Sequence, residues 1–340
     1  MKHILLTSAP DQLLTDNWNR MLADAPFATH YCTPNYFKDP YLRGEAFAVL
    51  AEQENGEIAG ALTGIWDRDK AISGLFVRPQ TVFGAGVDLQ ATSAALINGI
   101  TELYDGKPGL VELFTWQPVP GFIDLGMSER EARDAMSVVV LDLSLGADAL
   151  FAGFSQTRRN EIRKALKQGM VEIKELETAG ELDEMYAIHV DWCARKGNPA
   201  DTFEQMKTAV TQRENRRTFI AKADGKVIAG SFYRFCPGGM VEYAGNSSIP
   251  EYQRLRPNDL IGWHALQWAC GEEFTHFSMG GSHLFLRRFG GEIMQTYRYR
   301  RDHSRLKLHD LREHTWELSL GAYKRLPPNV RANVKKVLVK

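Results

Sequence analysis

An internal repeat is the feature that most constrains the fold of this chain. Residues 46–62 and residues 218–232 each read as an apolar strand, an acidic turn and a return strand that passes through Ile-Ala-Gly. The turns contain Asn55-Gly56 and Asp224-Gly225. Such pairs between apolar runs indicate β-hairpins, because both central residues of a type I′ turn need positive φ. The repeat therefore predicts two copies of one structural unit.

The elements that follow the two hairpins come in the same order. We expect a third strand over 71–77 and 240–245, a helix over 90–103 and 258–272, and a further strand over 110–115 and 275–279. This mixed order favours two similar α+β domains, each a mostly antiparallel sheet flanked by helices, over one doubly wound sheet. A strand over 138–143 would end the first copy. The expected division is a domain over 1–150, a second over 151–305 and a basic helical tail over 306–340.

Composition places the chain among globular proteins. Its 340 residues are 44% hydrophobic and 24% charged, and they suffice for two domains. No window approaches the roughly 18 consecutive apolar residues of a membrane span, and the N-terminal apolar run is too short for a signal peptide. The four cysteines are widely spaced and form no CxxC pair, which indicates reduced thiols rather than a disulfide framework or a zinc site. We expect a cytoplasmic protein.

The net charge of −1 hides a strong asymmetry. Residues 298–340 contain twelve Lys and Arg against four Asp and Glu, and residues 321–340 contain six basic residues and no acid. A basic tail on an acidic body suggests an anionic partner such as a phosphate, a nucleic acid or a lipid surface. A solvated C-terminal helix would account for the same pattern.

Two basic clusters are candidates for binding phosphate. A helix expected to begin near Ser155 carries Arg158, Arg159 and Arg163, and it is either a phosphate-facing wall or an ordinary charged surface. Arg254 and Arg256 directly precede Pro257 and Asn258, where an apolar and therefore buried helix begins. Free amide N–H groups together with two guanidinium groups make that second position a plausible anion site.

A glycine-rich segment after a predicted strand is the third candidate. It comprises Gly280, Gly281, Ser282 and His283, and Arg287 and Arg288 follow it. Paired glycines let a ligand or another backbone approach closely, and a histidine there could serve as a general base, although a lone histidine is more often structural. The sequence contains no HExxH, GxSxG or GxxxxGK[ST] motif, so metal-dependent hydrolase, serine hydrolase and nucleotide hydrolase functions lose support.

Several of these segments together resemble one family, the FemAB/FemX-type transferases and their relatives in the GNAT superfamily. The resemblance covers nearly the whole chain. The segments that carry it are Phe154–Ala165, Pro250–Asn258, Gly280–Ser282 with Arg288–Glu292, Tyr297–Arg300 and Tyr323–Pro327, and residues 79–86 in the first half.

The resemblance implies two GNAT-like domains in tandem and transfer of an acyl or aminoacyl group from an activated donor to an amine. It implies acyl-CoA or an acyl carrier as the donor, acyl-CoA being the expected co-substrate, with no tightly bound cofactor or metal and a small or amino-acid-like acceptor. Arg158, Arg159, Arg163, Arg254, Arg256 and Asn258 would hold the phosphates of the donor. Gly280, Gly281, Ser282, Arg287 and Arg288 would bind substrate, and Glu242, Tyr243 and His283 would be the catalytic residues.

Two alternatives stay open beside that interpretation. A transferase that modifies a cell-wall precursor would take its donor from aminoacyl-tRNA, for which the basic tail offers a partner surface. A non-catalytic member of the fold would only bind such a precursor. A lysine that the family carries in its Phe-Lys motif is replaced here by Leu286, and the glycines with which GNAT enzymes cradle the CoA pyrophosphate are absent.

Overall fold

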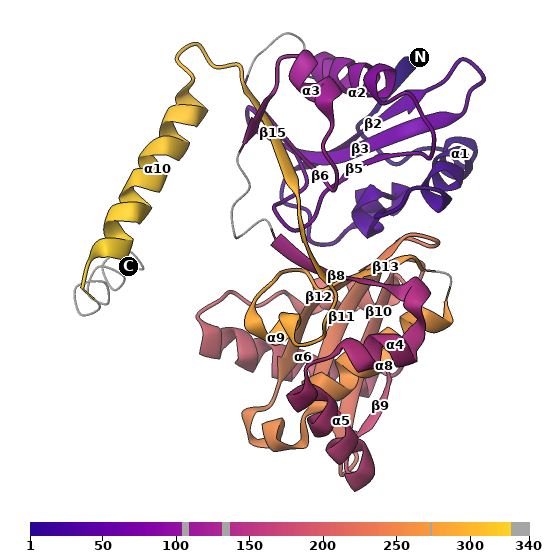
Figure 1. Ribbon diagram of the computed structural model, residues 1–340, viewed down its shortest axis with the longest axis vertical. Coiled ribbons are helices and arrows are strands. Elements are labelled where there is room, and N and C mark those ends of the chain that lie inside the picture. The colour runs from indigo at the N-terminus through magenta and orange to yellow at the C-terminus, as the bar shows by residue number, and fades with distance from the viewer. Residues whose placement is uncertain (104–108, 131–136, 273, 328–340) are drawn as a thin grey trace.

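The computed structural model describes residues 1–103, 109–130, 137–272 and 274–327. Two β-sheets with flanking helices form two lobes, one above the other in Figure 1. Both sheets are mixed and mostly antiparallel, which confirms the predicted α+β class.

The first sheet has the strand order β1-β2-β3-β4-β6-β15-β7, and β5 pairs with β3. In it β4 and β6 are parallel. The strands are β1 (Lys2–Leu6), β2 (Glu45–Glu52), β3 (Ile58–Asp67), β4 (Lys70–Ser73), β5 (Thr81–Phe83), β6 (Leu110–Thr115), β7 (Ser128–Arg130) and β15 (Tyr297–Asp302).

Alternation along β2 explains why helices cover both faces of this sheet. Phe47 and Val49 pack with α2 (Leu89–Leu103) and α3 (Pro120–Asp124), whereas Ala48 and Leu50 pack with α1 (Gln12–Ala23) on the other face. Successive side chains of a strand point to opposite faces, so a continuous apolar run requires cover on each. Two short 3-10 turns, η1 (His30–Cys32) and η2 (Pro34–Lys38), follow α1.

The second sheet has the order β14-β8-β13-β12-β11-β10-β9, and β12 and β13 are parallel. Its strands are β8 (Ser137–Asp142), β9 (Glu172–Glu175), β10 (Arg216–Ala223), β11 (Lys226–Phe235), β12 (Met240–Ser248), β13 (His276–Ser278) and β14 (Glu292–Gln295). Its helices are α4 (Gly146–Gly153), α5 (Gln156–Gln168), α6 (Ala179–Lys196), α7 (Phe203–Thr211), α8 (Pro257–Gly271) and α9 (Leu284–Arg287), and the turn η5 (Pro250–Leu255) precedes α8.

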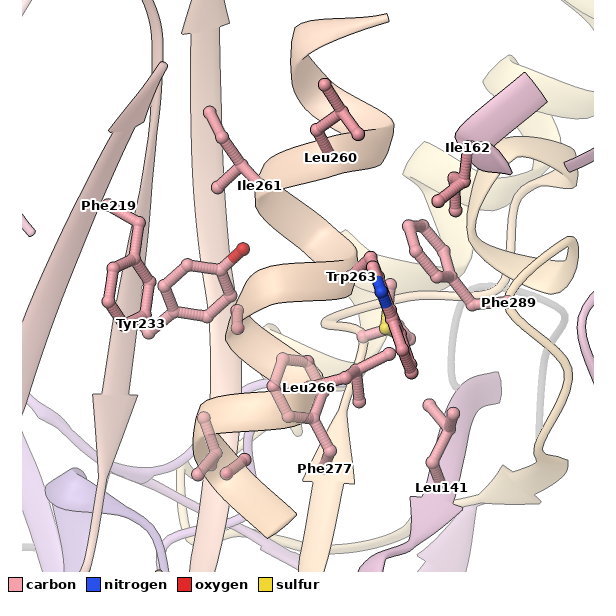
Figure 2. Close-up of a cluster of buried hydrophobic side chains, with 14 of the residues drawn as sticks. Leu141, Ile162, Phe219, Tyr233, Leu260, Ile261, Trp263, Leu266, Phe277 and Phe289 are labelled. Carbon is pink, nitrogen blue, oxygen red and sulfur yellow. The ribbon is translucent and has the colours of Figure 1, made fainter. Parts of the chain in front are cut away.

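Helix α8 is the centre of the second core. Figure 2 shows Ile261 of this helix on the side of strand residue Tyr233 and Trp263 on the side of Phe289. These residues belong to one buried cluster with Leu266 and Phe277. Helices α6 and α7 cover the opposite face through a separate cluster. The predicted buried helix is therefore confirmed, and it covers one face of the sheet.

The expected boundary at 145–155 does not separate the two sheets. Strand β8, which the prediction placed at the end of the first domain, lies between β14 and β13 of the second sheet. In exchange, β15 from the second half pairs with β6 and β7 of the first sheet. The two sheets therefore exchange strands, and the chain crosses between the lobes more than once (Figure 1).

Both predicted hairpins form, but with different turns. Asp224 and Gly225 have φ of 51° and 78°, as a type I′ turn requires. In the first hairpin Gly56 has φ of 85° and donates its N–H to the carbonyl of Gln53, so that loop is longer than two residues. The repeat prediction is correct at the level of the strands.

The tail begins as the predicted helix, α10 (Leu308–Arg325), and residues 328–340 lie outside the described residues. Its first turns are tied to β15, because Arg298 pairs with Glu313 at 2.5 Å and Arg300 with Asp310 at 2.7 Å. Beyond these contacts α10 projects from the body (Figure 1). No helix in the part of the chain that the structure describes is long and apolar enough to cross a membrane.

Candidate active site

A cavity of about 640 Å³ lies between the two lobes. The first lobe contributes the η1–η2 segment and the loop after β4, and the second contributes α6 and strands β10, β11 and β12. Cavities of this size, formed where domains meet, are the usual binding places for small molecules. Its polar lining includes Asp39, Arg78, His189, Asp201, Arg216, Arg234, Asn246 and Ser247, and its aromatic lining includes Tyr31, Tyr36, Tyr41, Trp192 and Tyr233.

A buried ion pair joins the lobes at one side of this cavity. Arg216 on β10 places Nη2 2.7 Å from Oδ2 of Asp39, and Nε2 of His30 lies 3.1 Å from the same oxygen. Burial lowers the pKa of His30 to about 4, so the ring is neutral at pH 7. Burial alone would raise the pKa of Asp39, but the hydrogen bond with His30 and the charge of Arg216 outweigh it and hold that pKa below its usual range.

Arg234 on β11 is a second cation in the cavity wall, and it differs from Arg216 in its partners. It is 9% exposed, it lies over the ring of Tyr31 at 4.8 Å, and its Nε has no hydrogen-bond partner among the described residues. Burial lowers its pKa, and the nearby Glu242 raises it by less. A buried guanidinium with a free donor is costly unless a ligand supplies the anion.

Glu242 is the one predicted catalytic residue that lies beside this cluster. It faces Arg234 across the β11–β12 ladder, and its Oε1 lies 2.5 Å from Nε of Arg78, which follows β4 in the first lobe. Glu242 is 1% exposed and does not line the cavity. Its carboxylate therefore positions Arg78 and balances the charge of the arginines that do.

The other two predicted catalytic residues lie elsewhere. Tyr243 points to the opposite face of β12, where burial raises its pKa and its hydroxyl donates to Oδ1 of Asn246 at 2.7 Å. His283 is exposed at the residue before α9 and lies against Phe285. Neither lines the cavity between the lobes.

The predicted phosphate-binding residues also lie away from that cavity. Arg158 is 2% exposed, pairs with Asp259 at 3.0 Å and covers the ring of Phe289 at 3.7 Å, so in this conformation it belongs to the core. Arg159 donates to the carbonyl of Ala152. Arg163 is exposed over the ring of Phe151.

The segment before α8 keeps its charges in solvent. Arg254 is exposed, and Arg256 is exposed and pairs with Glu161 at 2.6 Å. The side chain of Asn258 donates to Oγ of Ser248 at 3.2 Å. Arg254 and Arg256 therefore lie in solvent beside the N-terminus of α8, and their role in binding phosphate stays a prediction.

The glycine-rich segment after β13 has a structural reason for its first glycine. Gly280 has φ of 67°, and a Cβ there would lie 2.5 Å from the carbonyl oxygen of Tyr243. The carbonyl of Gly281 accepts from Val139, and Ser282 lies 2.6 Å from Ser137. This segment ties β13 to β8, which fits the prediction that another backbone approaches closely here.

Arg287 and Arg288, which follow that segment, are exposed, and Leu286 just before them is apolar. Arg287 donates to the carbonyl of Ser282, and the carbonyl of Arg288 accepts from Ser155. Leu286, at the position of the family lysine, is 2% exposed and packs in the second core. It leaves no cationic head group at this point.

A small apolar pocket adjoins the cavity between the lobes. Tyr243, Asn258, Phe285 and Phe289 line it, and Tyr233 lines both spaces. A β-bulge shifts the β11–β12 register beside Tyr233, and bulges often lie next to active sites, where they redirect side chains. Residues of β12 after the bulge contact the lining of the small pocket. Asn246, which lines the cavity, accepts a hydrogen bond from Tyr243, and Ser248 accepts one from Asn258.

None of the predicted site residues lines the cavity between the lobes, and its arginines were missed. One signal for them exists in the sequence. Arg234 interrupts the otherwise apolar run Phe232–Phe235, and Arg216 begins the apolar strand of the second hairpin. A cation inside a buried strand is rare without an anionic partner or ligand. Asp39 and Arg78, the partners from the first lobe, have no such local signal.

Comparison with known proteins defines the class. Residues 152–301 match the acetyltransferase (GNAT) domain family. Among solved structures, FemX aligns at 12% identity and a TM-score of 0.71, over 88% of this chain and 97% of its own. L-PGS from Bacillus licheniformis aligns at 12% identity and 0.59, over 89% and 96%, and a tandem GNAT protein from the clavulanic acid biosynthesis pathway at 12% and 0.52, over 88% and 98%. No curated protein matches the sequence.

The chain thus has the tandem GNAT fold that FemX also has. Residues 152–301 match an acetyltransferase (GNAT) domain, which confirms the fold implied by the resemblance of the motifs. At these low identities the solved structures show the fold only. The identity of the donor and of the acceptor has to be inferred from the residues of the site.

Proposed function

We propose that this protein is an N-acyltransferase that acylates the amine of a small, anionic, amino-acid-like acceptor bound in the cavity between the lobes. The observation that carries the proposal is Arg234, a buried cation of the cavity wall whose Nε has no hydrogen-bond partner among the described residues. A carboxylate or phosphate of the acceptor would supply that partner, because guanidinium groups bind such anions with two parallel hydrogen bonds.

The donor would approach from the other side of β12. The exposed Arg254 and Arg256 at the N-terminus of α8 would hold the phosphates of acyl-CoA or of an acyl carrier, where the helix dipole favours anions. A pocket of about 10 Å³ behind Asn258 shares Tyr233 with the cavity, and a bound donor would have to widen it to reach the acceptor. The amine nitrogen would attack the acyl carbonyl near Tyr233 as the thiolate leaves.

Two other functions remain candidates from the family resemblance. An aminoacyl-tRNA donor would need an extended cationic surface, and binding would weaken steeply with salt. A non-catalytic binding protein would keep the cavity and lack turnover. We favour a compact donor, because Arg254 and Arg256 lie together at one helix end.

Calorimetric titration with acetyl-CoA and a long-chain acyl-CoA tests the donor class. Micromolar binding that Arg254→Glu abolishes is expected, and Lys164→Glu, an exposed change on α5, is the matched control that should bind normally. Absence of binding to both compounds would contradict an acyl-CoA donor. Titration with aminoacyl-tRNA in 50 and 200 mM salt would then test the first alternative.

We also propose that the cytoplasmic face of a membrane is the anionic partner of the tail. Leu311, Trp316 and Leu318 of α10 are 58%, 68% and 62% exposed, and the sequence after them is basic without acids. Exposed Leu and Trp on a helix with neighbouring cations suit an anionic lipid surface better than a nucleic acid.

A further inference from the structure

We propose that Ser247, His189 and Asp201 form a proton relay in the cavity wall that deprotonates the attacking amine. This inference rests on the proposed function and adds the residues that perform its acid–base chemistry. All three side chains line the cavity, and they come from three separate elements: Ser247 from β12, His189 from α6 and Asp201 from the loop between α6 and α7.

The distances follow the order of a relay. Oγ of Ser247 lies 3.2 Å from Nδ1 of His189, and Nε2 of the same ring lies 3.4 Å from Oδ2 of Asp201. The backbone N of Asp201 also lies 3.4 Å from Nε2, and Sγ of Cys193 lies 3.6 Å from it. The relay uses the tautomer that carries its proton on Nε2, in which the N–H faces the carboxylate of Asp201 and Nδ1 accepts from the serine hydroxyl. A carboxylate on one nitrogen and a hydroxyl on the other is the arrangement by which a histidine becomes a general base.

The fold holds this histidine at a fixed place. Helix α6 begins with a capping box between Thr178 and Glu181, and Arg195 near its end donates to the carbonyl of Ser248 at 2.9 Å. The His189 ring also lies edge-on to Phe232. Strand β12 therefore carries both the serine of the relay and the carbonyl that anchors α6.

The chemistry balances without any further reactant. The amine nitrogen forms a bond to the acyl carbonyl carbon and passes a proton to Oγ of Ser247, which gives its own proton to Nδ1 of His189. Asp201 stabilises the resulting imidazolium. When the carbon–sulfur bond of the donor breaks, the leaving thiolate takes the electron pair and then the proton from His189, which restores the relay. Ser247 is the residue that touches the substrate, and Asp201 is a positioning residue.

The test is steady-state acyl transfer with acetyl-CoA and an amino-acid panel, followed by mass spectrometry of the product. His189→Ala should lower kcat at least 100-fold with KM within threefold, and added imidazole should restore part of it. Asp201→Asn should lower kcat about 10-fold, and Ser247→Ala at least 10-fold. Asp183→Asn, an exposed change on the same helix, is the matched control and should leave kcat unchanged.

The outcomes separate this inference from the proposed function. Wild-type kcat in His189→Ala, or a loss that imidazole does not restore, overturns the relay while acyl transfer stands. An acyl group trapped on Ser247 also overturns it, because the serine would then be a nucleophile. Asp201 has an exposed carboxylate, 39% accessible, so Asp201→Asn should fold even if a core variant does not, and unchanged kcat in it contradicts the relay. No turnover by the wild type overturns the proposed function, and the relay with it.

Discussion

Nη2 of Arg216 lies 2.7 Å from Oδ2 of Asp39, and this contact joins a strand of one lobe to the turn region of the other. Asp39→Asn would leave the guanidinium buried without its anion. We expect a loss of about 3–5 kcal/mol in the free energy of unfolding, the usual cost of removing one partner of a buried pair. Denaturant unfolding followed by circular dichroism measures it. Asp124→Asn, an exposed change in the same lobe, should stay within about 0.5 kcal/mol, and an equal loss in both variants would contradict the contact's role.

His30 makes the stability of the protein depend on pH. Its pKa is about 4 in the fold against 6.5 when unfolded, so the unfolded chain binds more protons between these values. Protonation of His30 therefore costs no stability above pH 6.5. As the pH drops to 4, it should lower the free energy of unfolding by about 3 kcal/mol. His30→Gln should remove this part of the decline in unfolding experiments from pH 7 to pH 4. An unchanged pH slope in that variant would contradict the buried neutral ring.

Arg234 and Arg216 should respond in opposite ways to the same substitution. Arg234→Met removes a buried cation that lacks a hydrogen-bond partner on Nε, so the free energy of unfolding should stay constant or rise. Arg216→Met strips Asp39 of its partner and should destabilise by about 3 kcal/mol or more. Thermal unfolding of the two variants side by side decides it. Destabilisation of equal size would mean that Arg234 has a structural rather than a ligand-binding role.

Much of the fold could be predicted because its signals are local. The hairpin around Asp224-Gly225 follows from turn chemistry, and α8 follows from Pro257 and the apolar residues after it. The exchange of β8 and β15 could not be predicted, because strand partners depend on contacts between residues far apart in the chain. A run such as Ser137–Leu141 fits any buried strand position.

The site was harder to predict for the same reason. The motifs identified the segment before α8, and the resemblance named Glu242 as a catalytic candidate. The cavity itself depends on pairs such as Arg216 with Asp39 and Arg78 with Glu242. Each pair spans the two lobes, so neither residue has a recognisable partner nearby in sequence. His189 likewise has no sequence signal, because its partner Ser247 comes from β12, far away in the chain.

The tail offers a prediction that does not depend on catalysis. If α10 and the basic residues after it in the sequence contact anionic lipid, the protein should sediment with phosphatidylglycerol vesicles and not with phosphatidylcholine vesicles. This binding should weaken as the salt concentration rises. Trp316→Ser with Leu318→Ser should reduce binding at least fivefold, because their apolar surface is exposed. Leu13→Ser, an exposed leucine on α1, is the control. Equal binding to both vesicle types, or to tRNA instead, would contradict a lipid partner.

We propose that Arg234 binds an anionic group of the acceptor in the cavity between the lobes. The most direct test is the ratio of kcat/KM for an amino-acid acceptor over its carboxamide, measured with acetyl-CoA. We predict a wild-type ratio of at least about 10, which corresponds to about 1.4 kcal/mol, and a ratio near 1 in Arg234→Met. Arg254→Glu should keep the wild-type ratio while weakening the binding of the donor. A ratio that survives in Arg234→Met would contradict the account.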